Sequence, residues 1–387
     1  MRIGIVGGAL QGMEAVYLAK RAGFETLVMD RRKDAPALSL CDIPIVENPL
    51  VNYDAAYNVL KTCDAVIPAC EETELLECLV RMFSDSDVPL MFDMHSYRIS
   101  CSKTLSNRMM EEAGIPLPGK WPDCGFPVIV KPSGQSGSIG VSVAFDESDI
   151  KAGLETVRSL GDEPVIQEFV HGRSVSVEVI GDGKNQVPFV TTEVVLDSNY
   201  DCKMVVCGPD ILPPEDDALF REYGRKAAEK MGLRGLMDVE AIATPKGLRV
   251  LEIDARIPSQ TPAAIEAATG INLLAELVSV FVGRKVGKTN PSPGASVYRH
   301  VVFENGVLRS SGEKVFGKVK TPRIEEGLFG TDRMITDYSE GSGCWRGTMI
   351  VSAPTVAEAV KKADASIGMM MDACGVDSFV DGTPEVV

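Results

Sequence analysis

Apolar and polar positions along the first ninety residues follow the pattern of short buried strands that alternate with amphipathic helices. Residues 2–6, RIGIV, form an apolar run that ends at Gly7. The apolar runs that predict strands are 2–6, 24–30, 64–68 and 88–92, and the helical patterns lie at 14–23 and 72–83. This βαβ alternation predicts a doubly wound, Rossmann-like domain over residues 1–93.

Beyond residue 93 the pattern becomes rich in β-branched runs separated by turn residues. These runs predict strands at 126–132, 165–170, 174–181, 187–196, 235–244 and 247–255, and helices at 103–113, 215–231 and 262–282. We divide this part into a central lid subdomain, 94–165, and a C-terminal subdomain, 166–387. The segment TNPSPGAS, 289–296, is a linker candidate, and short strands with one helix, 356–371, are predicted in the last ninety residues. The chain is therefore predicted to be a multidomain protein of mixed α/β and α+β class.

The composition of the chain limits the kinds of partner that it is expected to bind. The net charge is -16 with only 39 Lys plus Arg, and without a basic face neither nucleic acid nor an anionic membrane is an expected partner. Ten cysteines without a CxxC pair, beside three histidines, argue against a zinc site and favour reduced thiols. No apolar stretch reaches the roughly 18 residues of a membrane span. We expect a cytoplasmic protein that binds small molecules.

The segment VIVKPSGQSGSIGV carries the first candidate chemistry. Lys131 ends an apolar strand, and Gly134, Gly137 and Gly140 punctuate the residues that follow. Such a strand could aim an ammonium group at phosphate oxygens while a glycine-rich hairpin covers them with backbone N–H groups. The alternative is an ordinary hairpin with a surface lysine, because the segment is not a Walker A sequence.

The next segment, VIQEFVHGRSVSVEVI, places two β-runs around a turn at 171–173. Its first run ends in residues whose extended backbone could hydrogen-bond an adenine edge: Gln167, Glu168, Phe169 and Val170. Ser176 and Glu178 alternate on the second run. They are either ligand contacts or the solvated face of a strand.

The most informative pattern is an acidic hairpin. Glu240 and Glu252 lie on two predicted antiparallel strands joined by a tight turn at TPKG, and Asp254 follows on the same face as Glu252. Carboxylates gathered on one sheet face repel one another unless a cation lies among them, and hard oxygen ligands suit magnesium. A solvent-facing strand is the weaker alternative, because both strands are otherwise apolar and Arg256 is the next residue of that face.

In order and spacing, KPSGQSGSIG, QEFVHGRSVSVEV and MDVEA with EIDARIPSQTP resemble the ATP-grasp ligases. The usual closing motif of that superfamily is Glu-x-Asn, and here Asp254 occupies the Asn position. The segments 6–30, 92–103 and 233–274 resemble more narrowly the ATP-grasp ligases of pyrrolysine biosynthesis, which join 3-methyl-D-ornithine to L-lysine. This narrower resemblance covers most of residues 1–290 and is weaker in the last hundred.

The resemblance implies an ATP-grasp fold, the cofactors ATP and two Mg²⁺ ions, and a role for each candidate residue. The implied ATP contacts are Lys103, Lys131, Ser138, Gln167, Glu168, Phe169, Val170 and Asp30. The implied metal ligands are Glu240, Glu252 and Asp254, and the implied catalytic residues are Arg256 and Lys131. The implied substrate contacts are Ser176 and Glu178 for 3-methyl-D-ornithine or D-ornithine, Leu10, Gln11 and Glu71 for L-lysine, and in addition Ser259. A homodimer is also expected.

Three alternatives remain open at this point. A dehydrogenase would explain the first strand, the glycine turn and Asp30, but the middle glycine of its fingerprint is Ala9 here. Another ATP-grasp enzyme, either a D-alanine-type dipeptide ligase or a carboxylase, is the stronger alternative. A nucleotide-binding regulatory protein without catalysis is expected to lack the acidic pair or Lys131.

Overall fold

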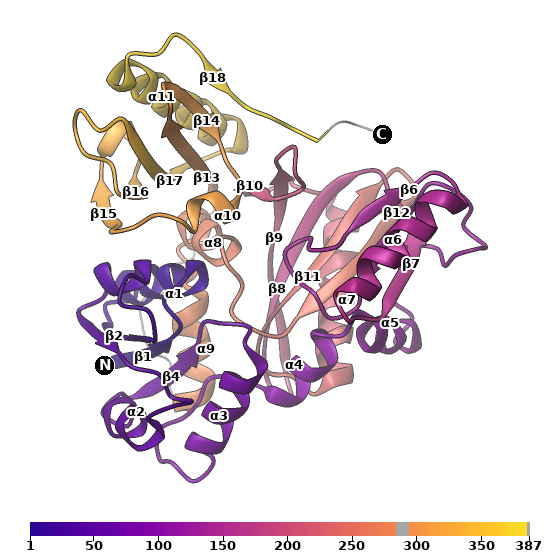
Figure 1. The fold of residues 1–387 in the computed structure, drawn as a ribbon, viewed down its shortest axis with the longest axis horizontal. Coiled ribbons are helices and arrows are strands. Elements are labelled where there is room, and N and C mark those ends of the chain that lie inside the picture. Colours follow the sequence, from indigo (N-terminus) through magenta and orange to yellow (C-terminus); the bar gives the residue numbers. More distant parts are fainter. Residues whose placement is uncertain (284–293, 385–387) are drawn as a thin grey trace. The chain divides into compact units, whose positions relative to one another are not determined.

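The computed structural model describes residues 1–283 and 294–384, so residues 289–293 of the predicted linker lie outside the described part (Figure 1). The chain forms two compact units, each built from separated segments. Unit 1 comprises Met1–Met94, Thr192–Ile211 and Ile257–Val387, and unit 2 comprises His95–Thr191 and Leu212–Arg256. The three-part division with boundaries near residues 93 and 165 stays a prediction.

Unit 1 begins with a four-stranded parallel sheet in the order β3-β2-β1-β4. Its elements are β1 (Arg2–Val6), α1 (Leu10–Arg21), β2 (Glu25–Asp30), η1 (Pro36–Ser39), β3 (Ile43–Val46), α2 (Tyr53–Leu60), β4 (Ala65–Pro68) and α3 (Thr73–Phe83). The predicted Rossmann-like alternation is confirmed, although β3 and α2 were not anticipated. The predicted strand at 88–92 is wrong: only one bridge forms, between Leu90 and Val66, in a segment where Pro89 has no N–H to donate.

The turn from β1 into α1 is unusually tight. Gly7 has a φ of +110°, and a Cβ on Gly12 would lie 2.1 Å from the Gly7 carbonyl oxygen. Only glycine at both positions lets the helix start directly against the end of the strand. The residues that open α1, Leu10 and Gln11, are thereby fixed at the carboxyl edge of the parallel sheet, where open α/β sheets bind ligands.

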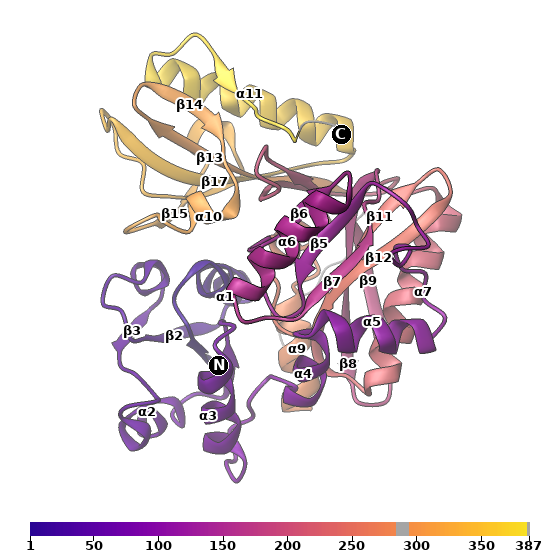
Figure 2. The ribbon, with the colours of Figure 1, turned by 45° about the vertical axis from the view of Figure 1, so that its right-hand side comes forward.

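Unit 2 contains two antiparallel sheets, which Figure 2 shows with their helices. The smaller has the order β6-β5-β7, and α6 packs on it; the strands of the larger that belong to this unit have the order β12-β11-β8-β9. The strands are β5 (Val128–Pro132), β6 (Ser142–Ala144), β7 (Pro164–Glu168), β8 (Arg173–Asp182), β9 (Gln186–Leu196), β11 (Arg234–Thr244) and β12 (Gly247–Asp254). The helices are α4 (Met94–Ser100), α5 (Lys103–Glu112), α6 (Glu147–Ser159) and α7 (Pro214–Met231).

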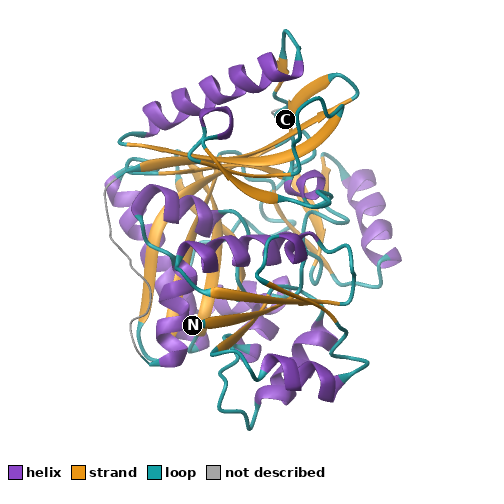
Figure 3. Ribbon diagram, turned by 90° about the vertical axis from the view of Figure 1, so that its left-hand side faces the viewer, coloured by secondary structure: helices purple, strands orange, loops and turns teal. Residues whose placement is uncertain are grey.

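The remaining strands of unit 1 extend from the second half of β9 in the order β10-β13-β17-β16-β15. The strands are β10 (Cys202–Cys207), β13 (Ala295–Glu304), β14 (Val307–Ser310), β15 (Arg323–Glu326), β16 (Arg333–Thr336), β17 (Cys344–Ala353) and β18 (Phe379–Val380); the helices are α8 (Thr261–Thr269), α9 (Leu273–Val282), α10 (Glu313–Phe316), η2 (Leu328–Gly330) and α11 (Val356–Cys374). α11 packs along β13 and β17 (Figure 3). β14, β15, β16 and β18 are short, as predicted, whereas β13 and β17 have ten residues each. The predicted helix is confirmed as α11.

The helix predicted over 262–282 is two helices. α8 ends at Gly270, whose φ is +73°, and the side chain of Asn272 caps α9 by accepting a hydrogen bond from the Ala275 N–H at 3.0 Å. The two helices are bent by 99°. Among the described residues, no single helix is long and apolar enough to cross a membrane, and this bent pair passes the length and composition test only when its two halves are joined.

Candidate active site

One face of the β8-β11-β12 sheet in unit 2 carries five carboxylates. Glu240 of β11 stands opposite Glu252 on β12 and opposite Ser176 on β8. Two residues along, Asp238 stands opposite Asp254 and Glu178. The strands alternate, so these side chains share one face, which we call the acidic face: Ser176, Glu178, Asp238, Glu240, Glu252 and Asp254. The predicted proximity of Glu240 and Glu252 on one hairpin is confirmed.

A β-bulge sets this register. The ladder pairs Glu240 with Glu252 but Ala241 with Val250, so Leu251 is an extra residue on β12. Without it, Val250 and Glu252 would fall on the same face of the strand. The bulge lets Val250 be fully buried while Glu252 joins the acidic face with 39% of its side chain exposed.

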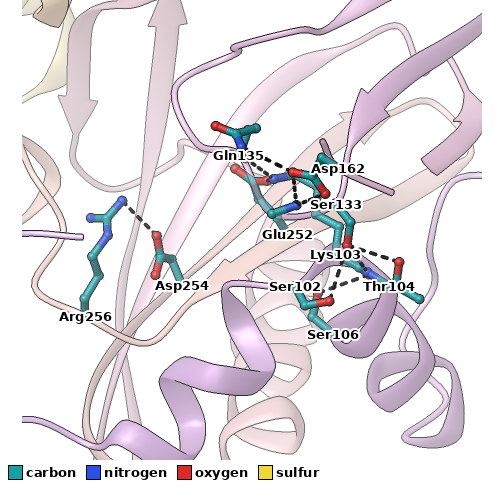
Figure 4. A network of polar contacts seen from close by, with 11 residues as sticks. Ser102, Lys103, Thr104, Ser106, Ser133, Gln135, Asp162, Glu252, Asp254 and Arg256 are labelled. Atoms are coloured by element: carbon teal, nitrogen blue, oxygen red, sulfur yellow. Dashed lines mark hydrogen bonds and ion pairs between the residues drawn. The ribbon is translucent and has the colours of Figure 1, made fainter. Parts of the chain in front are cut away.

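The positive charges of two lysines offset the negative charge of Glu252. The Lys103 Nζ lies 3.1 Å from its Oε2 and also donates to the carbonyl oxygen of Gln135 at 2.7 Å (Figure 4). Desolvation tends to raise the pKa of Glu252, but the charges of Lys103 and Lys131 outweigh it and the pKa is lowered. Burial lowers the pKa of the Lys131 ammonium, which is only 6% exposed, against the opposing effect of Glu252. Glu252 is therefore held as a carboxylate beside two cations suited to phosphate.

Arg256 balances the other end of the face. Its Nη2 lies 2.8 Å from Asp254 Oδ2. Figure 4 shows this ion pair separated from the network around Lys103. Both side chains are mostly buried, at 14% and 25% exposed. Close charge pairs of this kind hold a guanidinium in one orientation.

Asp238 is a member of this face that our sequence reasoning missed. It is 9% exposed, and its Oδ1 has no hydrogen-bond partner. Burial, followed by the charges of Asp254 and Glu240, raises its pKa well above the ordinary value, while Arg256 opposes the shift. The signal was present in MDVEA, because Asp238 precedes Glu240 by two residues and alternation puts both on one face.

The glycine-rich segment is a hairpin between β5 and β6, as predicted. Asp162 holds its base by accepting from the Gly134 N–H at 3.1 Å and from the Gln135 side chain at 3.3 Å. Ser138 at the tip is exposed and has a φ of +58°. The anchor was not foreseen, because it lies 28 residues from the glycine that it binds.

At the end of β7, part of the segment predicted to contact adenine is hydrogen-bonded within the protein, and its ATP contacts stay a prediction. Gln167 is 5% exposed, and the side chain of Glu168 accepts from the Gly119 N–H at 2.9 Å. The N–H groups of Glu168 and Phe169 donate to the carbonyl oxygens of Gly119 and Pro127. An adenine edge would therefore have to use other groups of the segment, including those of Val170.

The remaining predicted residues lie in unit 1. The Gln11 side chain donates to Glu71 at 3.1 Å, where β1 and β4 end. Leu10 opens α1 beside them. The Asp30 carboxylate accepts from the Gly8 N–H at 2.6 Å and the Arg32 N–H at 2.7 Å, a local role in the turn, and its ATP contact stays a prediction.

Ser259 also lies in unit 1, where its hydroxyl donates to Glu313 at 3.2 Å. It is partly exposed. The hydrogen bond ties it to α10 in the C-terminal part of the chain. Its contact with substrate stays a prediction.

The donor set on the acidic face fits magnesium. Within residues 1–283 and 294–384 no three His, Cys, Asp or Glu side chains are grouped so that they could hold a metal by themselves. Mg²⁺ at nucleotide sites needs only one or two carboxylates, because phosphates and waters complete its six ligands. Glu240 and Glu252, opposite each other in the register, supply such a pair.

Comparisons with known proteins agree with this geometry. Residues 101–260 match the model of an ATP-grasp domain. The chain is 37% identical over 313 residues to the 3-methyl-D-ornithine–L-lysine ligase of Methanosarcina barkeri, which covers 80% of this chain and 82% of the relative. It is 38% identical over 317 residues to the same ligase of Methanosarcina mazei, which covers 80% and 81%. The chain belongs to the family of 3-methyl-D-ornithine–L-lysine ligases.

A solved structure agrees on the fold of this ligase family member. The biotin carboxylase domain of 2-oxoglutarate carboxylase from Hydrogenobacter thermophilus superposes with a TM-score of 0.73 at 16% identity, over 95% of this chain and 89% of the other. The predicted ATP-grasp fold is thereby confirmed. Family membership also sets aside the dehydrogenase and the non-catalytic regulatory protein.

Proposed function

We propose that this protein uses ATP to join the carboxyl group of 3-methyl-D-ornithine, or of D-ornithine in its place, to the side-chain amine of L-lysine. Membership of the ligase family supports the reaction. The observation that carries the proposal in this chain is the acidic face, where Glu240 and Glu252 stand opposite each other beside Lys103 and Lys131.

In the first step, a carboxylate oxygen of the ornithine substrate attacks the γ-phosphorus of ATP. The bond from that phosphorus to the ADP oxygen breaks, and an acyl phosphate forms. Lys103 and Lys131 are proposed to bind the phosphates, and Glu240 and Glu252 would hold Mg²⁺, which would supply charge neutralisation there. Two ions, with Asp254 as a further ligand, remain a prediction.

In the second step, the neutral side-chain amine of lysine attacks the acyl carbon. Phosphate leaves with the oxygen that came from the carboxylate, and the amine nitrogen releases one of its two protons and keeps the other as the amide N–H. Arg256, oriented by Asp254, is proposed to stabilise the oxyanion of the tetrahedral intermediate. The glycine-rich loop, anchored by Asp162, is proposed to keep water from the acyl phosphate.

Both amino acids are cationic, so each requires an acidic receptor. Glu178 is fully buried and accepts a hydrogen bond from Ser176 at 3.3 Å, and Asp238 stands opposite it in the register. We assign this end of the face to an ammonium group of the ornithine substrate. Gln11 and Glu71, joined at 3.1 Å, are assigned to lysine with Leu10.

The location and assembly also remain proposals. All ten cysteines are free thiols, which agrees with a reducing cytoplasm. A homodimer is proposed, and its mass in solution, measured by light scattering, tests it.

A product assay tests the function. Purified protein is incubated with Mg-ATP, L-lysine and D-ornithine, and the mixture is analysed for an ornithyl-lysine mass and for ADP. We expect both products in equal amounts and neither when one amino acid is omitted. D-Alanine alone serves as the control for a dipeptide ligase. ADP formation that requires D-alanine or bicarbonate instead would contradict the substrate assignment.

A further inference from the structure

Gln260 occupies a strained turn immediately after Ser259. Its φ and ψ are 73° and -59°, and the Thr261 N–H donates to the Ser259 carbonyl oxygen at 2.8 Å. This is a γ-turn of the positive-φ kind, which is rare and costly for a residue with a side chain. Such a conformation persists only where neighbouring groups stabilise it. Gln260, which immediately precedes α8, therefore needs such neighbours.

The surroundings of Gln260 are three side chains of unit 1. Its backbone N–H donates to the Oε2 of Glu14 on α1. Its side-chain nitrogen donates to Glu313 on α10 at 3.1 Å and lies 3.1 Å from His300 Nε2 on β13. Glu313 also accepts from Ser259, so the same carboxylate binds two successive residues of the turn.

The contacts continue into the core. The other oxygen of Glu14 accepts from the Tyr298 hydroxyl, and His300 Nδ1 lies 2.6 Å from the Thr348 hydroxyl. Gln260, Glu14, Tyr298 and His300 are at most 2% exposed. A buried carboxyl group is costly without hydrogen bonds, and Glu14 makes its two with the Gln260 N–H and the Tyr298 hydroxyl.

We propose that Glu14 is a positioning residue that holds the Ser259–Gln260 turn and couples the binding of the two amino acid substrates. This inference rests on the proposed function. Glu14 lies one helical turn after Leu10 and Gln11, which we assign to lysine, and its carboxyl binds the turn that carries Ser259, whose substrate contact we assign to the ornithine substrate. A lysine that shifts the start of α1 therefore shifts the turn, and the reverse holds with equal strength because coupling is reciprocal.

The inference gives the C-terminal region a role. Tyr298 and Glu313 both follow residue 293. Tyr298 binds Glu14, and Glu313 binds Ser259 and Gln260, so both take part in the support of the turn. The region after the predicted linker thus contributes to the geometry of the Ser259–Gln260 turn.

Hydrogen exchange tests, without any substrate, whether Glu14 holds the Ser259–Gln260 turn; we call this hold the clamp. In Glu14→Ala, the amides of residues 257–264 are expected to exchange about tenfold faster or more, because the Gln260 N–H loses its acceptor. In Glu14→Gln, which keeps an acceptor oxygen, exchange should stay near wild type. Tyr298→Phe, which removes only the hydroxyl that orients Glu14, serves if Glu14→Ala does not fold. Glu155→Ala, an exposed change on α6, is the control. Unchanged exchange in Glu14→Ala and Tyr298→Phe overturns the clamp.

Calorimetry then tests the coupling. L-Lysine is titrated into Mg-ADP-loaded protein with and without D-ornithine. We expect D-ornithine to tighten lysine binding at least about fivefold in wild type, to do so less in Glu14→Gln, and to have no effect in Glu14→Ala. Equal coupling in all variants, or none in wild type, overturns the inference. If wild type binds neither amino acid, the proposed function fails, whereas the exchange result still decides the clamp.

Discussion

Two groups of mostly buried carboxylates in this protein are stabilised in opposite ways. On the acidic face, lysines lower the pKa of Glu252, and an arginine pairs with Asp254. In unit 1, Glu14 has a tyrosine hydroxyl and a backbone N–H as partners, and burial raises its pKa to about 8. The first arrangement keeps charge where we propose that a metal and phosphates bind. The second favours the protonated form of a carboxyl group that holds a turn.

The largest effect should come from removing charge on the acidic face. Glu252→Gln is expected to lower the rate of ADP formation about 100- to 1,000-fold, because a neutral amide neither binds magnesium well nor balances Lys103 and Lys131. The melting temperature should change little. The rate is followed by a coupled ADP assay, with Glu155→Gln as the matched exposed control; a fully active Glu252→Gln protein would contradict the metal role.

Asp238→Asn, on the same face, should stabilise the protein and at the same time weaken the binding of D-ornithine. The change relieves repulsion from Asp254 and Glu240, so the free energy of unfolding should rise by about 1 kcal/mol. The KM for D-ornithine should rise about tenfold, which corresponds to one lost ammonium contact. Urea unfolding and initial rates measure the two effects. A variant that is less stable than wild type and has an unchanged KM would remove Asp238 from the proposed receptor.

The raised pKa of Glu14 should make the free energy of unfolding depend on pH. Its pKa is raised from 4.5 to about 8 in the folded protein, so the stability that it contributes is complete below pH 4.5 and is lost as pH rises toward 8. Between these values, wild type should lose up to about 1.4 kcal/mol per pH unit relative to Glu14→Gln. Unfolding at pH 5.5, 6.5 and 7.5 measures the difference, and parallel curves would show that Glu14 is ionised throughout.

The smallest effect should come from an exposed carboxylate outside both groups. Glu112 pairs with Arg108 at 3.3 Å and with Lys230 at 3.4 Å, and all three side chains are at least 45% exposed. Glu112→Gln should change the free energy of unfolding by less than about 0.5 kcal/mol, because water screens such pairs. A larger loss in urea unfolding would mean that exposure is a poor guide to the role of carboxylates in this protein.

The acidic face was predictable from the sequence in most of its parts. A two-residue turn at Pro245 and Lys246 joins the two strands, so the proximity of Glu240 and Glu252 follows from local rules, whereas their direct pairing depends on the bulge: the register of the turn alone would pair Glu240 with Leu251. Asp238 obeys the same rule and was overlooked. Leu251 could not be foreseen as a bulge, because nothing in its apolar neighbourhood marks an extra residue.

The polar support of Gln260 was not predictable in the same way. Its partners Glu14, His300 and Glu313 lie between 40 and 246 residues away, and no local pattern encodes contacts over such distances. The break between α8 and α9 is a different case. Gly270 and Asn272 are an ordinary helix end and helix cap, and they were hidden by an apolar pattern that continues across them.

The most direct test of the account follows the oxygen atoms. D-Ornithine labelled with ¹⁸O in both carboxyl oxygens is incubated with the protein, Mg-ATP and L-lysine, and the released phosphate is analysed by mass spectrometry. An acyl phosphate intermediate predicts one ¹⁸O atom in the phosphate for each amide bond formed, together with one ADP. Unlabelled phosphate, or release of AMP and pyrophosphate in place of ADP, would contradict the proposed reaction.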